Sequence, residues 1–166
     1  MKRIALLVVY LGEIPNYIHL FLKSCEYQKN IDFFFFTNWD WSIPPPIVKN
    51  IKINVIDNLY FNKLASQKCG LNIEIKKGYK LCDMKPAWPH IFEDYLGEYE
   101  FVGWCDIDLV LGNINSFFSE SLKAKYDLLT VCNNRLYFGC IDNNPKYKNN
   151  EIALSKSKRL GTDISR

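Results

Sequence analysis

The sequence predicts an α/β fold in which helices flank a mainly parallel β-sheet. Segments typical of strands and helices follow one another in the order strand, helix, strand, strand, helix. The first segment, residues 4–10, is a continuous apolar run rich in branched side chains, as expected of a central strand covered on both faces. The 166 residues are 48% hydrophobic and 15% aromatic, so the chain can bury one sizeable core.

The first half of the chain divides into elements by its apolar pattern. After the opening strand, apolar residues recur with helical spacing at Ile18, Phe21, Leu22 and Cys25. Asn16 is the expected N-cap of this helix. Residues 31–37 predict a second strand, and the alternation in residues 51–55 predicts a half-exposed third strand. A helix over residues 58–68 is expected to end at Gly70, because glycine readily adopts the left-handed backbone that ends many helices.

The second half has shorter elements. Residues 79–95 show a broadly helical pattern that Pro86 and Pro89 must kink or restart, because proline cannot continue the hydrogen bonding of a helix. Residues 101–105 predict a fourth strand, a short helix follows, and residues 128–132 predict a fifth strand.

The end of the chain carries a weaker pattern. Residues 1–132 are expected to form one domain, and residues 133–166 a poorly ordered or divergent tail, because asparagine- and lysine-rich sequence buries little apolar area. On this interpretation the C-terminal half of the fold is incomplete, and the sheet lacks its last elements.

The composition argues against several function classes. A net charge of +3, from 21 basic and 18 acidic residues, is too small to indicate nucleic-acid binding. With only His19 and His90, a histidine-built zinc site or a Ser-His-Asp triad is hard to assemble. No apolar stretch approaches the roughly eighteen residues of a transmembrane segment. The six cysteines form no Cys-x-x-Cys pair, and several lie inside apolar runs, where a free thiol packs as a small hydrophobic group. We therefore expect a reducing compartment and a cytoplasmic protein, free or peripheral at the inner face of the membrane.

Two aspartates directly follow the predicted fourth strand. In an extended backbone, side chains at i and i+2 point to the same side, so Asp106 and Asp108 can aim both carboxylates at one point beyond the strand end. Carboxylate oxygens suit Mg²⁺ or Mn²⁺, which keep open positions for phosphate oxygens and water. The pattern therefore predicts a metal site, with a solvated pair of loop aspartates as the alternative.

Several segments resemble a known family. Residues 79–86 contain Lys-x-Cys-Asp-x-Lys-Pro, and residues 103–113 contain Cys-Asp-x-Asp. Together with residues 91–95 and the opening strand and helix, they resemble an uncharacterised bacterial family related to GT-A glycosyltransferases, whose members occur with surface-polysaccharide genes. The resemblance covers about residues 2–130. It implies a GT-A-like (Rossmann-like) fold that binds a nucleotide-sugar donor, with Mn²⁺ or Mg²⁺ as cofactor.

The resemblance also implies roles for residues before the fourth strand. Asp83 would contact the sugar or the ribose, and Lys80 or Lys85 the diphosphate. The related enzymes often carry arginine three residues after the aspartate, where this chain has Pro86. The alternative is that these side chains are solvent-exposed on a helical turn and bind no ligand.

Position alone suggests further candidates. Trp104 lies two residues before Asp106 on the same side of the strand, where it would wall the nucleotide pocket, although a strand tryptophan is more often part of the core. Residues at the ends of the first two strands would read the base and ribose, because ligands in such sheets bind at the strand carboxyl ends. These residues are Tyr10, Gly12, Thr37 and Asn38.

The leading hypothesis is a metal-dependent glycosyltransferase of cell-surface polysaccharide biosynthesis, acting on a saccharide or lipid-linked acceptor. A nucleotidyltransferase is an alternative, but the usual Gly-rich basic loop is absent after the first strand. A non-catalytic remnant that binds nucleotide is another. GT-A enzymes often draw a third metal ligand, frequently histidine, from their later segment, and no histidine follows His90. We therefore expect an incomplete enzyme that binds a donor weakly without transferring sugar.

Overall fold

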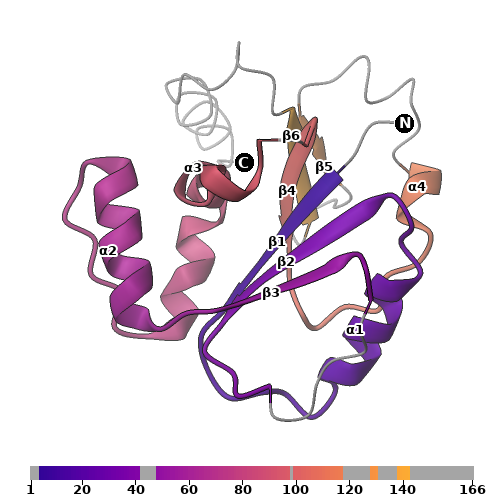
Figure 1. Ribbon diagram of the computed structural model, residues 1–166, viewed down its shortest axis with the longest axis horizontal. Helices are drawn as coiled ribbons and strands as arrows, with labels where there is room; N and C mark the ends of the chain where they lie inside the picture. Colours follow the sequence, from indigo (N-terminus) through magenta and orange to yellow (C-terminus); the bar gives the residue numbers. More distant parts are fainter. Residues whose placement is uncertain (1–3, 42–47, 98, 118–127, 131–137, 143–166) are drawn as a thin grey trace, which may run out of the picture.

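A computed structural model describes residues 4–41, 48–97, 99–117, 128–130 and 138–142 (Figure 1). Its strands are β1 (Ile4–Tyr10), β2 (Ile31–Thr37), β3 (Ile51–Val55), β4 (Phe101–Cys105), β5 (Leu128–Thr130) and β6 (Phe138–Asp142). The α-helices are α1 (Ile18–Glu26), α2 (Asn58–Cys69), α3 (Trp88–Ile91) and α4 (Ile114–Phe117), and two 3₁₀ helices are η1 (Gly78–Ala87) and η2 (Glu93–Tyr95).

The strands form one sheet in the order β3-β2-β1-β4-β6-β5. The first four are parallel, whereas β6 pairs antiparallel with β4 and β5 pairs antiparallel with β6. This confirms the predicted α/β fold with a mainly parallel sheet. Because the chain builds outward from β1 to β3 and then returns to place β4 on the other side of β1, the strand order reverses between β1 and β4.

The sheet extends past the expected domain boundary at residue 132. Strand β6 comes from the segment expected to be a tail, and it lies between β4 and β5. The expected fifth strand is present over Leu128–Thr130. Residues 143–166, which make up most of the expected tail, lie outside the described residues.

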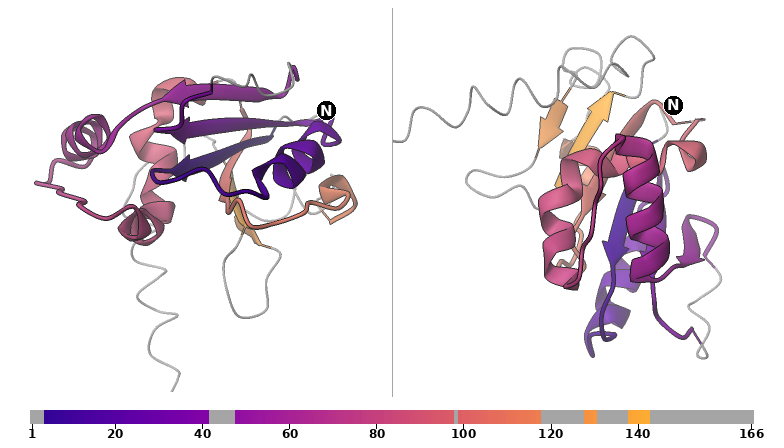
Figure 2. Two further views of the ribbon diagram at one scale, coloured as in Figure 1. Left: turned by 90° about the horizontal axis from the view of Figure 1, so that it is seen from below. Right: turned by 90° about the vertical axis from the view of Figure 1, so that its left-hand side faces the viewer.

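Helices cover both faces of the sheet (Figures 1 and 2). Alternate residues of β1 point to opposite faces, so Leu6 and Val8 pack with helix α1, while Leu7 and Val9 pack with α2, η1 and α3. Every residue of β1 except Tyr10 is buried. This burial on both faces explains why the first strand carries no polar alternation.

The helix ends follow side-chain chemistry. Asp57 caps α2, because its Oδ1 accepts a hydrogen bond from the backbone N–H of Tyr60 at 2.7 Å. Gly70 ends α2 with a left-handed φ of 64°, as predicted. Asn16 is not the N-cap of α1. Tyr17 occupies that position without a side-chain cap, and the Asn16 carbonyl instead lies 3.1 Å from Nδ1 of His19.

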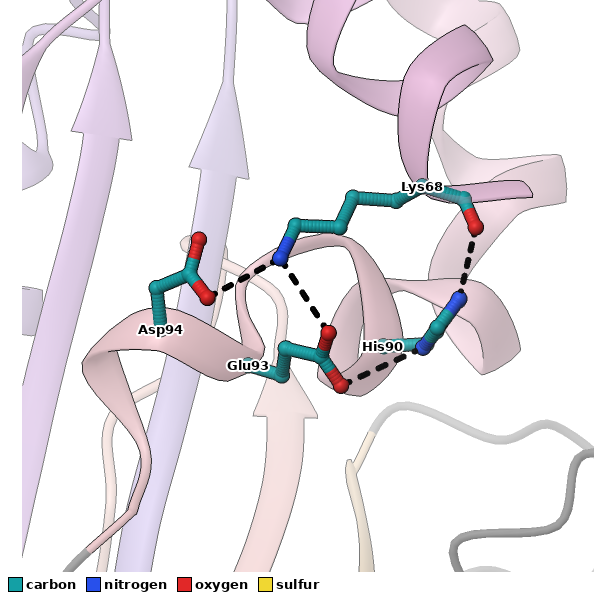
Figure 3. A network of polar contacts seen from close by, with 4 residues as sticks. All are labelled: Lys68, His90, Glu93 and Asp94. Carbon is teal, nitrogen blue, oxygen red and sulfur yellow. Dashed lines mark hydrogen bonds and ion pairs between the residues drawn. The ribbon is translucent and has the colours of Figure 1, made fainter. Parts of the chain in front are cut away.

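The segment with two prolines is divided into short helices, as expected. Pro86 lies within η1, and Pro89 occupies the first turn of α3, where a missing N–H costs little. The end of α2 is fastened to the helices that follow (Figure 3). Lys68 Nζ lies 3.1 Å from Glu93 Oε1 and 2.9 Å from Asp94 Oδ1. Nε2 of His90 donates to the Lys68 carbonyl at 2.8 Å.

A buried amide joins three segments at the amino ends of β2 and β3. Asn50 Nδ2 lies 2.9, 3.0 and 3.1 Å from the carbonyl oxygens of Cys25, Gln28 and Ile31. These contacts link the end of α1 and the start of β2 to the residue that precedes β3. Only a donor group satisfies three converging carbonyls, which fixes the orientation of the amide.

We predict that Asn50→Asp destabilises the protein more than Asn50→Ala. The alanine variant loses these hydrogen bonds, which lowers the free energy of unfolding by about 2 kcal/mol. The aspartate variant buries a carboxylate that faces carbonyl oxygens, which lowers the free energy of unfolding by about 3–5 kcal/mol. Urea unfolding at pH 7 measures both, with the exposed Asn72→Asp as a control. Equal stability of the two Asn50 variants would contradict the arrangement.

Candidate functional site

A cleft of about 380 Å³ lies where the strand order reverses, at the carboxyl ends of β1 and β4. Residues 8–11 and 105–108 form its floor, and residues of η1 and α3 form one wall, with Tyr17 also contributing. In open α/β sheets this reversal point is where ligands bind. The volume falls within the range of small-molecule sites.

The geometry of η1 selects which of its side chains face the cleft. A 3₁₀ helix has three residues per turn, so side chains at i and i+3 lie in one row. Tyr79, Cys82 and Lys85 form such a row and line the cleft, together with Gly78 and Leu81 of a second row. Lys80 and Asp83 belong to the remaining row and do not line the cleft.

One glycine brings η1 close to the sheet. A β-carbon at Gly78 would lie 2.1 Å from the carbonyl oxygen of Leu11, much closer than atoms can approach. Only glycine therefore allows the start of η1 to pack against the end of β1. This contact sets the distance between the η1 row and the strand ends.

An ion pair crosses the cleft. Lys85 Nζ lies 2.5 Å from Asp106 Oδ1, and the two side chains are 13% and 25% exposed. Such limited contact with water strengthens the attraction relative to a surface pair. Asp108 is exposed and lines the same cleft. The two predicted metal ligands therefore share one cleft with a cation from η1.

The donor set fits a hard divalent cation only with additional oxygens. In the described part of the chain, no three His, Cys, Asp or Glu side chains gather into a group that could hold a metal ion. A cation here would be held by the two carboxylates, with water or phosphate oxygens completing its shell. Mg²⁺ is commonly bound in this way, through one or two carboxylates and the phosphates of a substrate.

Asp83 and Lys80 lie outside the cleft, although the resemblance implies that Asp83 contacts the sugar or the ribose of a donor whose diphosphate meets Lys80 or Lys85. They form an exposed ion pair of 3.0 Å beside a shallow depression that Lys76 and Lys77 also line. The hydrogen bond to Asp83 raises the pKa of Lys80. The alternative of a solvated helical turn describes this pair, but not Lys85.

The remaining candidate site residues lie in different surroundings: one lines the cleft and others are buried in the protein. Tyr10 lines the cleft, and burial raises the pKa of its hydroxyl. Trp104 is 4% exposed and packs in the core, so it does not wall the cleft. Thr37 is buried and accepts a hydrogen bond from Trp41 Nε1 at 3.3 Å.

Gly12 and Asn38 hold two loops together. The Gly12 N–H donates to Asn38 Oδ1, and Trp39 Nε1 donates to the Gly12 carbonyl, both at 2.9 Å. Neither Gly12 nor Asn38 lines the cleft. Their role is to join the ends of β1 and β2.

Several cleft residues were missed by the sequence interpretation. A 3₁₀ helix repeats every three residues, and this spacing along residues 79–88 would have identified Tyr79, Cys82 and Trp88 as neighbours of Lys85 in the cleft. The buried Gln28 fixes the loop after the aspartates, because its Nε2 donates to the Gly112 carbonyl at 2.8 Å. A single glutamine on a helix end gives no sequence signal for this role.

Comparison with known families places the chain. Residues 6–158 match the family of unknown function DUF6625. The chain belongs to this family. The DUF6625 match begins within β1 and continues past β6, so it spans every residue of the cleft and reaches into the segment expected to be a tail. No curated protein matches the chain. Among the described residues of this DUF6625 protein, no helix is long and apolar enough to cross a membrane.

We predict that Gly78→Ala destabilises this DUF6625 protein by about 3 kcal/mol, because the added methyl group forces η1 away from β1. The control is Gly97→Ala, where a β-carbon would meet nothing within 4 Å. Urea unfolding of both variants measures the difference. If Gly78→Ala were as stable as the control, the close approach would not exist in solution.

Proposed function

We propose that this DUF6625 protein is a metal-dependent glycosyltransferase that takes a nucleotide-sugar donor. The observation that carries the proposal is the placement of Asp106, Asp108 and Lys85 together in the cleft at the strand reversal. This is where nucleotides bind in many α/β proteins. The likeness of the Lys-x-Cys-Asp-x-Lys-Pro and Cys-Asp-x-Asp motifs to the GT-A-related family supports the same function.

Each group in the cleft has a role in this proposal. A bound Mn²⁺ or Mg²⁺ supplies positive charge to the departing nucleoside diphosphate. Asp106 and Asp108 hold the cation, and Lys85 offers an ammonium group to a phosphate oxygen. Tyr10 and Tyr17 present aromatic surface to the donor at the end of β1. We place the reaction in cell-surface polysaccharide synthesis, with a saccharide or lipid-linked acceptor, on the strength of the motif likeness.

We predict that Asp106→Ala and Asp108→Ala each abolish Mn²⁺-dependent binding of the donor. A thermal-shift screen with UDP-, GDP-, CMP- and dTDP-sugars, with and without Mn²⁺, measures binding as ligand-induced stabilisation. The variants are compared by the ligand-induced shift in melting temperature rather than by the melting temperature itself. The reason is that Asp106→Ala also leaves Lys85 without its partner, which changes the stability of the protein without ligand. Asp83→Ala is the matched control and should keep the full shift. A full Mn²⁺-dependent shift in both cleft variants would refute the assignment.

We also predict that a bound donor protects Cys82 from alkylation. This thiol is exposed and lines the cleft, whereas Cys69 is partly buried elsewhere. Saturating donor and Mn²⁺ should slow the reaction of Cys82 with iodoacetamide by about tenfold or more and leave that of Cys69 unchanged, as followed by peptide mass spectrometry. An unchanged Cys82 rate at saturation would place the donor outside this cleft.

A transfer assay separates enzyme from binding protein. The full chain is incubated with the donor selected above, Mn²⁺ and a cell-envelope acceptor extract, and both nucleotide release and sugar incorporation are measured. Transfer that disappears in Asp108→Ala supports the glycosyltransferase. Cys82 protection without transfer would favour the non-catalytic, nucleotide-binding alternative.

A further inference from the structure

Lys85 forms an ion pair with the Asp106 carboxylate, which the divalent cation would also need as a ligand. Its ammonium lies 2.5 Å from Asp106 Oδ1, and only 13% of the Lys85 side chain is exposed. A divalent cation bound to Asp106 would meet this ammonium at short range. Because water screens the pair poorly, the repulsion between the two cations is strong. The cation and the lysine therefore compete for one carboxylate.

The backbone that carries Lys85 is fixed, and its side chain is not. Gly78 seats η1 against Leu11, so the helix cannot move away from the strand ends as a body without losing that contact. The four-carbon stem of lysine, in contrast, can rotate the ammonium to another acceptor. The row formed by Tyr79, Cys82 and Lys85 points into the cleft, so an anion in the cleft lies within the reach of that rotation.

We propose that Lys85 keeps the metal site closed until a diphosphate enters, so that the cation and a nucleoside diphosphate bind cooperatively. The inference rests on the proposed function and adds that binding of the cation depends on binding of the diphosphate. A diphosphate oxygen takes the ammonium from Asp106, and the freed carboxylate then holds the cation. By reciprocity, each ligand raises the affinity for the other by the same factor.

The test measures Mn²⁺ affinity of the full chain by electron paramagnetic resonance of free Mn²⁺. Lys85→Met removes the charge and keeps most of the length of the side chain. Lys80→Met is the matched control, because it removes a lysine of the same helix that pairs with Asp83 outside the cleft. Each protein is titrated with Mn²⁺ alone and then in the presence of UDP, GDP or dTDP, with the Mn²⁺ held by free nucleotide subtracted.

Lys85→Met is expected to bind Mn²⁺ alone at least about tenfold more tightly than the unmodified protein. The nucleoside diphosphate should raise Mn²⁺ affinity by a clearly larger factor in the unmodified protein and in Lys80→Met than in Lys85→Met. Lys85→Arg retains the charge and should bind Mn²⁺ alone no more tightly than the unmodified protein. This variant provides the test if Lys85→Met does not fold, as judged by circular dichroism, and tighter Mn²⁺ binding by it would overturn the proposal.

The two proposals fail in different ways. If Mn²⁺ and nucleotide bind but Lys85→Met matches Lys80→Met in affinity and coupling, the inference about Lys85 is overturned and the proposed function stands. If no protein in the series binds Mn²⁺ or any of the nucleoside diphosphates, both the function and the inference are overturned.

Discussion

The burial of β1 on both faces is the constraint from which the site follows. Its apolar side chains supply two separate cores, so helices must cover the sheet on both sides. Its two backbone edges are taken by β2 and β4, which are widely separated in sequence. The carboxyl ends of β1 and β4 therefore lie side by side, and the chain runs from both of them toward the face that α1 covers. The cleft lies beside these strand ends, and residues of η1 and α3 complete its lining.

Helix η1 gives the cleft its chemistry. Pro86 and Pro89 prevent a single long α-helix, and the three-residue turn that results separates neighbouring side chains into distinct rows. Lys85 enters the cleft while Asp83, only two residues earlier, faces the solvent. Residues two apart lie on different sides of a helix, so the placement of η1 beside the strand ends brings Lys85 into the cleft and leaves Asp83 outside it.

The sequence predicted what local patterns determine, and less of what depends on tertiary pairing. Burial on both faces marked β1, and the cap chemistry of Gly70 marked the end of α2. Asp106 and Asp108 line one cleft, but Ile107 between them lines it too, and the chain bends at residues 107 and 108, so the i, i+2 rule for extended backbone does not account for their placement. Strand β6 was missed because its short apolar run lies between asparagine-rich segments, and it joins the sheet by pairing with β4, which is distant in sequence. Trp104 and Asp83 were misplaced because position along an element does not tell which neighbouring surface a side chain meets.

The charges of the cleft set a condition on what it can hold. Lys85, Asp106 and Asp108 are the acidic and basic residues that line it, so it carries one net negative charge with the lysine protonated and the aspartates ionised. A divalent cation alone would reverse that charge and place two cationic groups on one carboxylate. A diphosphate alone would bring further negative charge against two aspartates. Entering together, the two ligands offset each other, and Lys85 exchanges one anionic partner for another. Because the Lys85–Asp106 pair has limited contact with water, this balance favours a cation–diphosphate pair over either component alone.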